Sequence, residues 1–359
     1  MNDVMLKLRL QRLLWNVGYF VRIEVPLSTF VPERFRSLKR FDITDIDVVG
    51  IRLDFDLQPD YVICDCKSGE RVKLFDRIFW LRGVMDFFKA RKGYLAITRE
   101  TEALKDIASR FNILVINEED LKEMEKRLSI QDKWIGSCNP TLPAEIRAYR
   151  EELRENHKKE INYLIYGYWM DPDFYQLKRI ITVGKGLSKK QNFSSEAFRW
   201  AVVEALIRFT LSLCMFSGKM YNIKEEHLKD ESLIHLYGGF ISKKEREDIL
   251  NYISRILSTY EKEPKIATLK LEPDYLNPLV EIIWRLTNQP IACRELPRFM
   301  DLLCYEYLLK NKQFSLDDLS HYFKEVDILM LVKLAKDIIE FYLDVSKIDK
   351  NMFQPLIKS

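Results

Sequence analysis

The sequence predicts an α/β N-terminal domain followed by an all-α C-terminal domain. Up to about residue 128, strand periodicity alternates with helical periodicity, and beyond about residue 130 strand patterns almost vanish. Residues 129–143 contain the glycine, asparagine and prolines that are typical of a linker. A chain of 359 residues is also long enough for two domains that each bury a core. We therefore expect an α/β domain over 1–130, a linker and charged helix over 131–160, and a helical domain over 161–359.

The N-terminal elements follow one another as helix, three strands, helix and strand, and then helix, strand and helix. Leucines at helical spacing precede Gly18, which ends the first helix, Pro26 closes the first strand, and Gly93 stops the second helix. Three strands followed by a helical crossover imply a meander that continues into a mixed sheet with helices on its faces. The expected elements are helices over 6–17, 72–91, 102–111 and 118–128, and strands over 20–27, 43–50, 61–67, 93–98 and 113–116.

The C-terminal region shows helix starts with identifiable capping residues. Ser194 or Ser195 precedes one apolar helix, and Ser242 precedes a second. Ser315 and Asp318 form a capping-box-like pair before a third. These caps predict that the region is helical throughout.

Three further segments of this region have distinct expectations. Residues 144–163 are highly charged and predict one continuous helix. Residues 197–216 are the most apolar long segment, but they contain three charged side chains, which favours a buried helix over a membrane span. Residues 183–190, VGKGLSKK, lack the spacing of a phosphate-binding loop and are interpreted as a mobile basic loop.

The composition excludes some classes of protein. The net charge of +3 is too small to indicate a nucleic-acid partner by itself. The six cysteines lie mostly in apolar runs, and neither they nor the four histidines have metal-ligand spacing, so we expect reduced core cysteines and no zinc. The N-terminus carries charges through its apolar part and resembles an amphipathic helix more than a signal peptide. We therefore expect a soluble, cytoplasmic protein with no membrane partner.

The candidate site lies on the second and third expected strands. Strand alternation places Asp45 and Asp47 on one face, and it places Asp65 and Lys67 on one face of the next strand. Two carboxylates can hold a magnesium-type ion, and the backbone carbonyl of Cys66 is a third oxygen ligand. Lys67 is placed to orient a water or to stabilise charge on a phosphate. The alternative is that Lys67 is simply the charge partner of Asp65.

This arrangement resembles the PD-(D/E)XK, or restriction endonuclease-like, nuclease superfamily. In that superfamily an α-β-β-β-α-β core carries an acid on its second strand and Asp/Glu-x-Lys on its third, which corresponds here to Asp47 and to Asp65-Cys66-Lys67. The likeness covers roughly residues 5 to 100. Many members also carry a glutamate on the first helix, where this chain has only Asp3, near its end, and Glu24 is the expected substitute.

The resemblance implies a Mg²⁺- or Mn²⁺-dependent hydrolase that cleaves phosphodiester bonds, with DNA as the expected substrate. It also implies roles in restriction, antiviral (phage) defence or repair. Two other functions remain open. In the first, the chain is a catalytically inactive nuclease-fold module that binds nucleic acid or a partner protein. In the second, its helical domain mediates homo-oligomerisation or assembly into a larger complex.

Two basic clusters are candidate phosphate contacts. Positive side chains near a nuclease site can bind the nucleic-acid backbone. The alternative is a solvated loop and a basic helix C-terminus that the helix dipole favours. The first cluster contains Arg34, Arg36, Lys39 and Arg40, and the second contains Lys89, Arg91 and Lys92.

Overall fold

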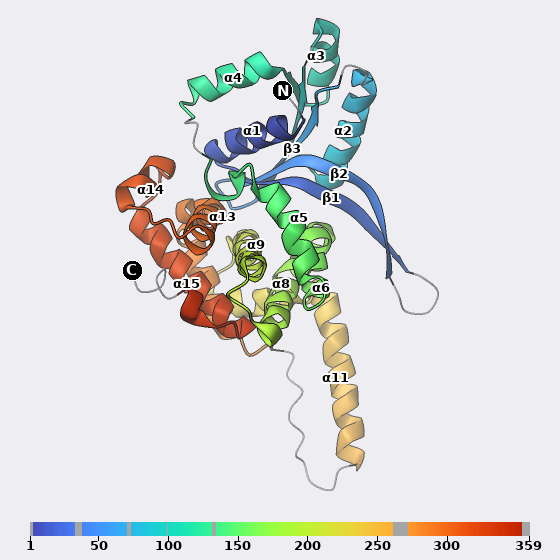
Figure 1. The fold of residues 1–359 in the computed structure, drawn as a ribbon. Helices are drawn as coiled ribbons and strands as arrows, with labels where there is room; N and C mark the ends of the chain where they lie inside the picture. Colours follow the sequence, from blue (N-terminus) through green and yellow to red (C-terminus); the bar gives the residue numbers. More distant parts are fainter. Residues whose placement is uncertain are drawn as a thin grey trace.

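The computed structural model shows a mixed sheet packed on a larger body of helices (Figure 1). It describes the backbone of residues 3–32, 38–69, 73–98, 100–130, 134–260 and 272–353, and the side chains of the same residues except 30–32, 38–39 and 257–260. The N-terminal elements are α1 (Asp3–Asn16), β1 (Phe20–Pro32), β2 (Leu38–Leu53), β3 (Pro59–Lys67), α2 (Leu74–Phe88), β4 (Lys92–Ile97), α3 (Glu102–Ser109), β5 (Ile113–Ile116) and α4 (Glu118–Arg127). The predicted order of elements and the mixed sheet are confirmed.

The five strands lie in the order β1-β2-β3-β4-β5. The first three are antiparallel, and β3, β4 and β5 are parallel. Val48 of β2 pairs with Cys64 of β3, so one further step of the same register places Asp47 opposite Asp65. The parallel neighbour of Asp65 on β4 is Leu95. The register alone therefore brings the two predicted carboxylates side by side.

Two predicted ends of elements were wrong. Pro26 does not close β1 but lies inside it, paired with Asp45. An edge strand such as β1 tolerates proline, because the N–H groups on its outer side have no neighbouring strand to bond. Helix α2 ends at Phe88, where Lys89 takes a left-handed backbone conformation with φ of 55°, and not at Gly93. Gly93 lies in β4, where a Cβ atom would sit 2.7 Å from the sulfur of Met85. That glycine allows α2 to pack closely on the sheet.

The helical region surrounds one long central helix, α9 (Glu196–Met220). It is long and apolar enough to span a membrane, but its apolar window is wholly buried within the protein. The predicted buried helix over 197–216 is therefore confirmed. The other helices are α5 (Leu142–Leu153), α6 (Lys158–Asn162), α7 (Tyr168–Met170), α8 (Asp173–Leu187), α10 (Glu225–Leu236), α11 (Phe240–Tyr260), α12 (Leu276–Thr287), α13 (Pro290–Leu303), α14 (Leu316–Tyr322) and α15 (Ile328–Ser346), joined by short 3₁₀ or π turns that include η1 (Gly136–Cys138), η2 (Tyr163–Gly167), η3 (Ser188–Lys190), η4 (Cys304–Leu309) and η5 (Lys350–Phe353).

Two of the predicted helix starts are confirmed and one is wrong. The hydroxyl of Ser195 accepts a hydrogen bond from Phe198 N at 3.1 Å, and Ser315 and Asp318 form a complete capping box. Ser242 lies inside α11, which begins two residues earlier. The six cysteines are free and buried, as predicted.

Two further expectations for the helical region were wrong. Residues 183–190 are not a mobile loop, because they form the end of α8 and the turn η3. Their glycines allow close packing: a Cβ on Gly184 would meet the hydroxyl of Ser346 at 2.3 Å, and one on Gly186 would meet Glu160 at 2.1 Å. Residues 144–163 are not one helix, since α5 ends at Leu153 and α6 begins at Lys158.

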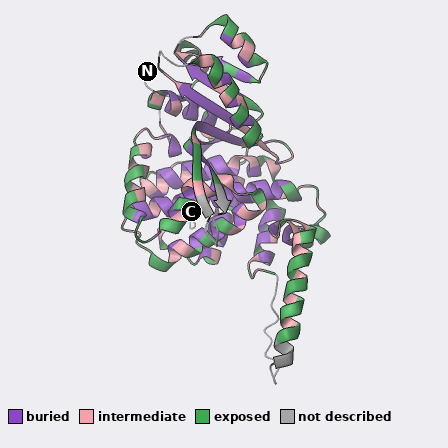
Figure 2. Ribbon diagram, turned by 90° about the vertical axis from the view of Figure 1, so that its right-hand side faces the viewer, coloured by how far each residue is buried: buried purple, intermediate pink, exposed green. Residues whose placement is uncertain are grey.

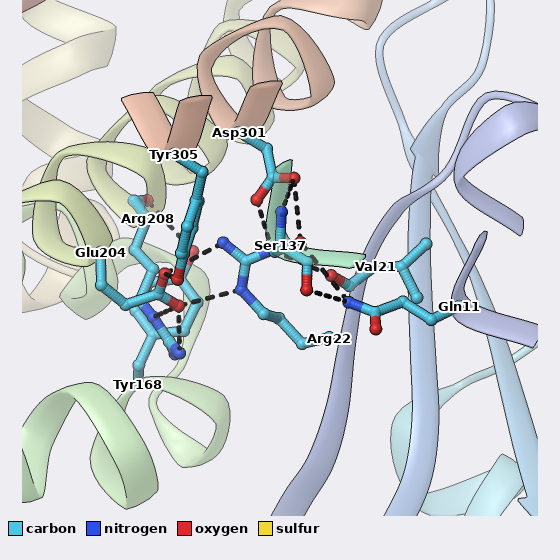
Figure 3. Close-up of polar contacts among 9 residues, drawn as sticks. All are labelled: Gln11, Val21, Arg22, Ser137, Tyr168, Glu204, Arg208, Asp301 and Tyr305. Atoms are coloured by element: carbon cyan, nitrogen blue, oxygen red, sulfur yellow. Dashed lines mark hydrogen bonds and ion pairs between the residues drawn. The ribbon is translucent and has the colours of Figure 1, made fainter. Parts of the chain in front are cut away.

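A buried polar cluster joins the sheet to the helices (Figure 3). At its centre is Arg22 of β1, which donates from Nε to Glu204 of α9 at 2.9 Å and from Nη1 to Asp301 of α13 at 2.7 Å. Arg208 and the Tyr305 hydroxyl also donate to Glu204. Charged groups this deep are stable only when paired and hydrogen-bonded, so this cluster fixes how the two regions meet.

One helix extends away from this body. Figure 1 shows α11 projecting beyond the other helices, and Figure 2 shows it mainly exposed while the sheet interior is buried. Its exposed side chains include the apolar residues Ile249 and Tyr252. The candidate site lies on the other side of the molecule, within the α/β region.

Candidate active site

The structure brings Asp47, Asp65 and Lys67 together where the interior of β2 lies beside the C-terminal end of β3. The ammonium of Lys67 lies 3.4 Å from Asp47 Oδ2 and 3.3 Å from Asp65 Oδ1. Both aspartates are buried, whereas the Lys67 side chain is 28% exposed. The cluster is therefore a pair of buried carboxylates reached from solvent past a lysine.

The backbone of β3 contributes directly to this cluster. Cys66 N donates a hydrogen bond to Asp47 Oδ2 at 2.7 Å, which fixes the orientation of that carboxylate across the two strands. The Cys66 thiol points away into the core, and burial raises its pKa well above the usual value. It is therefore neither a nucleophile nor a thiolate ligand.

Two cations of the site were not predicted from the sequence. Lys7 of α1 lies 2.9 Å from Asp47 Oδ1, and Arg77 of α2 donates to both oxygens of Asp65, with Nε at 2.7 Å from Oδ2. The sequence does place a cation on each of the two helices that flank the strands. The spacing of residues within a helix, however, does not show which side chain of the sheet that cation contacts. Three cations thus surround two carboxylates.

These cations control the protonation of Asp47. Burial raises the pKa of Asp47, but the hydrogen bond from Cys66 N and the ammonium of Lys7 outweigh it, so the pKa lies below the usual value for an aspartate. Burial lowers the pKa of Lys7, but the negative charges of Asp47 and Glu24 outweigh the effect of burial, so the pKa of Lys7 is raised. Asp47 is therefore ionised at neutral pH and Lys7 is protonated.

The donor set suits a magnesium-type ion in part. Asp47 and Asp65 supply adjacent carboxylate oxygens, the ligands that such an ion prefers, at a point that already accommodates the positive charge of Lys67. The described part of the chain contains no group of three or more His, Cys, Asp or Glu side chains arranged to hold a metal ion. Such an ion would therefore need the Cys66 carbonyl or water to complete its shell, and it would compete with Lys7, Lys67 and Arg77 for the carboxylates.

The acid of the first helix lies closer to this region than the sequence suggested. The position of Asp3 near the chain end favoured excluding it, yet its Oδ1 accepts a hydrogen bond from Ser68 N at 2.6 Å, next to Lys67. Helix α1 therefore brings both a carboxylate and the Lys7 ammonium to the end of β3.

The two supporting acids have different positions. Glu24 lies opposite Asp47 in the register of β1 and β2, and its Oε1 is 3.4 Å from the Lys7 ammonium. Its backbone is left-handed, with φ of 51°. Asp45 is exposed and makes none of the contacts that join Asp47, Asp65 and Lys67. Glu24 thus reaches the site through Lys7, whereas Asp45 lies where the face it shares with Asp47 is open to solvent, so its expected supporting role stays a prediction.

The predicted basic residues that the structure describes do not lie at the site. Lys92 pairs with Val62, three residues before Asp65, so the second cluster lies about 10 Å away along the strands. In the first cluster the Arg40 guanidinium pairs with Asp42 and stacks 3.6 Å from the ring of Tyr166. Arg91 N donates to the carbonyl oxygen of Tyr61 in β3, and Lys89 follows the last residue of α2, so both lie near the start of β4 with Lys92. Arg34, Arg36 and the Lys39 side chain lie outside the described residues.

No model of a known protein family, no curated protein and no solved structure matches this chain. Its function must therefore be inferred from its own chemistry. The arrangement of Asp47, Asp65 and Lys67 is the feature that points to a reaction.

Proposed function

We propose that this protein is a metal-dependent nuclease of the PD-(D/E)XK type that hydrolyses phosphodiester bonds, with DNA as the expected substrate. The observation that carries the proposal is the position of Lys67, whose ammonium is within 3.4 Å of both Asp47 and Asp65. Side chains from two neighbouring strands meet there in the order that the resemblance requires. The element order from α1 to β4 supports it.

The roles of the residues follow from their contacts. Asp47 and Asp65 would hold Mg²⁺ or Mn²⁺, which when bound supplies charge neutralisation on the phosphate and a more acidic water. Arg77 holds Asp65 in place through two hydrogen bonds, and Cys66 N holds Asp47. Lys67 is the most exposed of the three central side chains, so it is placed to orient a water or to stabilise charge on the phosphate.

The test is cleavage of DNA and RNA by the purified full chain with Mg²⁺ or Mn²⁺. We expect Asp65→Asn and Lys67→Met each to lower the cleavage rate by about 100-fold or more, the effect typical of removing one group that acts on the transition state. The matched controls are Asp106→Asn, which changes an exposed helix carboxylate, and Lys105→Met, which removes a lysine of the same helix that pairs with Glu100. Circular dichroism shows whether each variant is folded. Equal cleavage by all five proteins would overturn the proposal.

A second function has a specific observation in its favour. Lys7, Lys67 and Arg77 already neutralise Asp47 and Asp65 within the protein, so the site is electrostatically complete without a metal ion. A nuclease fold with such a site would act as a binding module for nucleic acid or a partner protein. Calorimetric titration with Mn²⁺ separates the two: binding that Asp65→Asn abolishes supports the nuclease, and absence of binding at millimolar Mn²⁺ supports the module.

A further inference from the structure

A cavity of about 120 Å³ lies where β1 meets the helical region. Its lining includes members of the cluster around Arg22, together with Arg147 and Arg150 of α5. Trp169 and Trp200 add aromatic surface. A cavity of this size has room for several water molecules or for a small charged group.

Three side chains that line the cavity have buried polar atoms without a partner. They are the Nη1 of Arg208, the indole Nε1 of Trp200 and the Oε1 of Gln11, none of which has a hydrogen-bond partner among the described residues. Arg208 is only 6% exposed. Leaving such atoms unpaired is unfavourable, and two of the three are donors, so the cavity is suited to a ligand that carries hydrogen-bond acceptors.

The charge of the lining favours an anion. Four arginines and two glutamates line the cavity. Glu204 is already paired with Arg22 and Arg208, and Glu24 is paired with Lys7. Arg147 makes no ion pair with any described residue, and Arg150 donates to the Tyr166 hydroxyl and not to a carboxylate. Two guanidinium groups at the side of the cavity are therefore free of acidic partners.

We propose that this cavity binds the phosphate group of a nucleotide, either a free mononucleotide or the phosphorylated end of a nucleic-acid strand. Guanidinium groups bind phosphate through paired, charge-assisted hydrogen bonds, and three arginines, Arg147, Arg150 and Arg208, present donors here. The aromatic surface of Trp169, which is half-buried, suits the base of the same nucleotide. Binding here does not depend on the proposed nuclease activity.

The cavity is linked to the candidate active site by one chain of ion pairs. Glu24 lines the cavity and pairs with Lys7, which pairs with Asp47. A phosphorylated strand end held in the cavity would therefore lie close to the carboxylates. If the phosphate belongs to a nucleic-acid strand, this arrangement would hold the end of that strand beside the candidate active site.

The experiment is a titration of the full chain with deoxyadenosine 5′-monophosphate in the presence of EDTA. Binding is measured by calorimetry and by the change in tryptophan fluorescence. EDTA keeps any nuclease silent, so failure here is distinct from failure of the proposed function. We expect Arg147→Gln and Arg150→Gln each to weaken binding at least about tenfold, because each removes a charge-assisted hydrogen bond. Arg154→Gln is the matched control, since Arg154 caps the same helix and is exposed. We expect it to bind as the wild type does.

The comparison ligands are deoxyadenosine and a short oligonucleotide with and without a 5′-phosphate. Deoxyadenosine should fail to bind, because it lacks the phosphate. Tighter binding of the phosphorylated oligonucleotide than of the mononucleotide supports the strand end, and the reverse supports a free nucleotide. The proposal is overturned if the mononucleotide does not bind at millimolar concentration, or if both arginine variants bind it as well as the wild type.

Discussion

The protein contains two clusters of acids and cations that differ in their exposure to solvent. Around Arg22, Asp301 is fully buried and the Glu204 side chain is 4% exposed. Around Asp47 and Asp65, the cations Lys67 and Arg77 are 28% and 25% exposed. The first cluster joins two regions of the fold, and the second lies at the C-terminal end of β3, beside the interior of β2.

The difference indicates which cluster can exchange its partners. Both oxygens of Glu204 are held by Arg22, and Arg208 and Tyr305 donate to the same group. Separating these groups means exposing the interface between the sheet and the helices. By contrast, the Lys67 side chain is partly exposed and can turn toward solvent without moving the backbone. Asp47 would then remain paired with Lys7 and Asp65 with Arg77, but the position between the two carboxylates would be open to another cation. We therefore assign a structural role to the first cluster and a chemical role to the second.

The largest expected effect comes from breaking the buried cluster. Arg22→Met leaves Asp301 without its cation and removes two hydrogen bonds from Glu204, so we expect the free energy of unfolding to fall by about 3 to 5 kcal/mol. Urea denaturation followed by circular dichroism measures this loss. Arg52→Met is the matched control on β2, where the partly exposed pair with Asp60 contributes about 1 kcal/mol or less. A similar small loss in both variants would contradict the structural role.

The dependence of the free energy of unfolding on acidic pH tests the same buried cluster, through the protonation of Glu204. Burial raises the pKa of Glu204, but Arg22 and Arg208 outweigh it and lower the pKa to about 2, whereas an unfolded glutamate has a pKa of about 4.3. The unfolded chain therefore binds the proton first as the pH falls. The contribution of Glu204 is fully present above about pH 4.5 and is lost as the pH falls toward 2, on the order of 3 kcal/mol.

Urea denaturation at pH 5, 4 and 3 measures this dependence. Asp301 acts in the opposite direction, because burial raises its pKa despite Arg22. The informative comparison is therefore with Glu204→Gln, which is less stable at pH 5 but should lose less further stability on acidification. Parallel losses in the two proteins would show that Glu204 does not titrate as the structure indicates.

The candidate site was largely predictable because its geometry follows from local rules. Strand alternation and an antiparallel register are enough to place Asp47 opposite Asp65 and Lys67 beside both. Lys7 and Arg77 were not predictable, because their positions depend on how α1 and α2 rotate against the sheet. Helix rotation is fixed by packing of many side chains and not by one spacing.

The buried cluster was predictable only in part. Glu204 and Arg208 are charged residues in an apolar segment, which indicates that they need partners. The partners, Arg22 and Asp301, lie 182 and 97 residues away from Glu204 in the sequence. No local pattern connects positions so far apart, so the contact between the two regions could only be seen in three dimensions.

The smallest effect is expected from substituting Lys7, and it is the most direct test of the chemical role of the second cluster. Its ammonium occupies Asp47 Oδ1 at 2.9 Å and so competes with a metal ion for that oxygen. Lys7→Met removes this competitor and leaves the carboxylate without its nearest cation, so we expect Mn²⁺ to bind about fivefold more tightly, equivalent to about 1 kcal/mol.

Calorimetric titration of the wild type, Lys7→Met and the control Lys105→Met, on α3, measures this change. Lys105 pairs with Glu100 away from the site, so its loss should leave Mn²⁺ affinity unchanged. Weaker binding by Lys7→Met would mean that Lys7 positions Asp47 for the metal ion and does not compete with it. In that case the ion pairs around Asp47 would be as fixed as those around Arg22, and the distinction between an exchangeable and a structural cluster would fail.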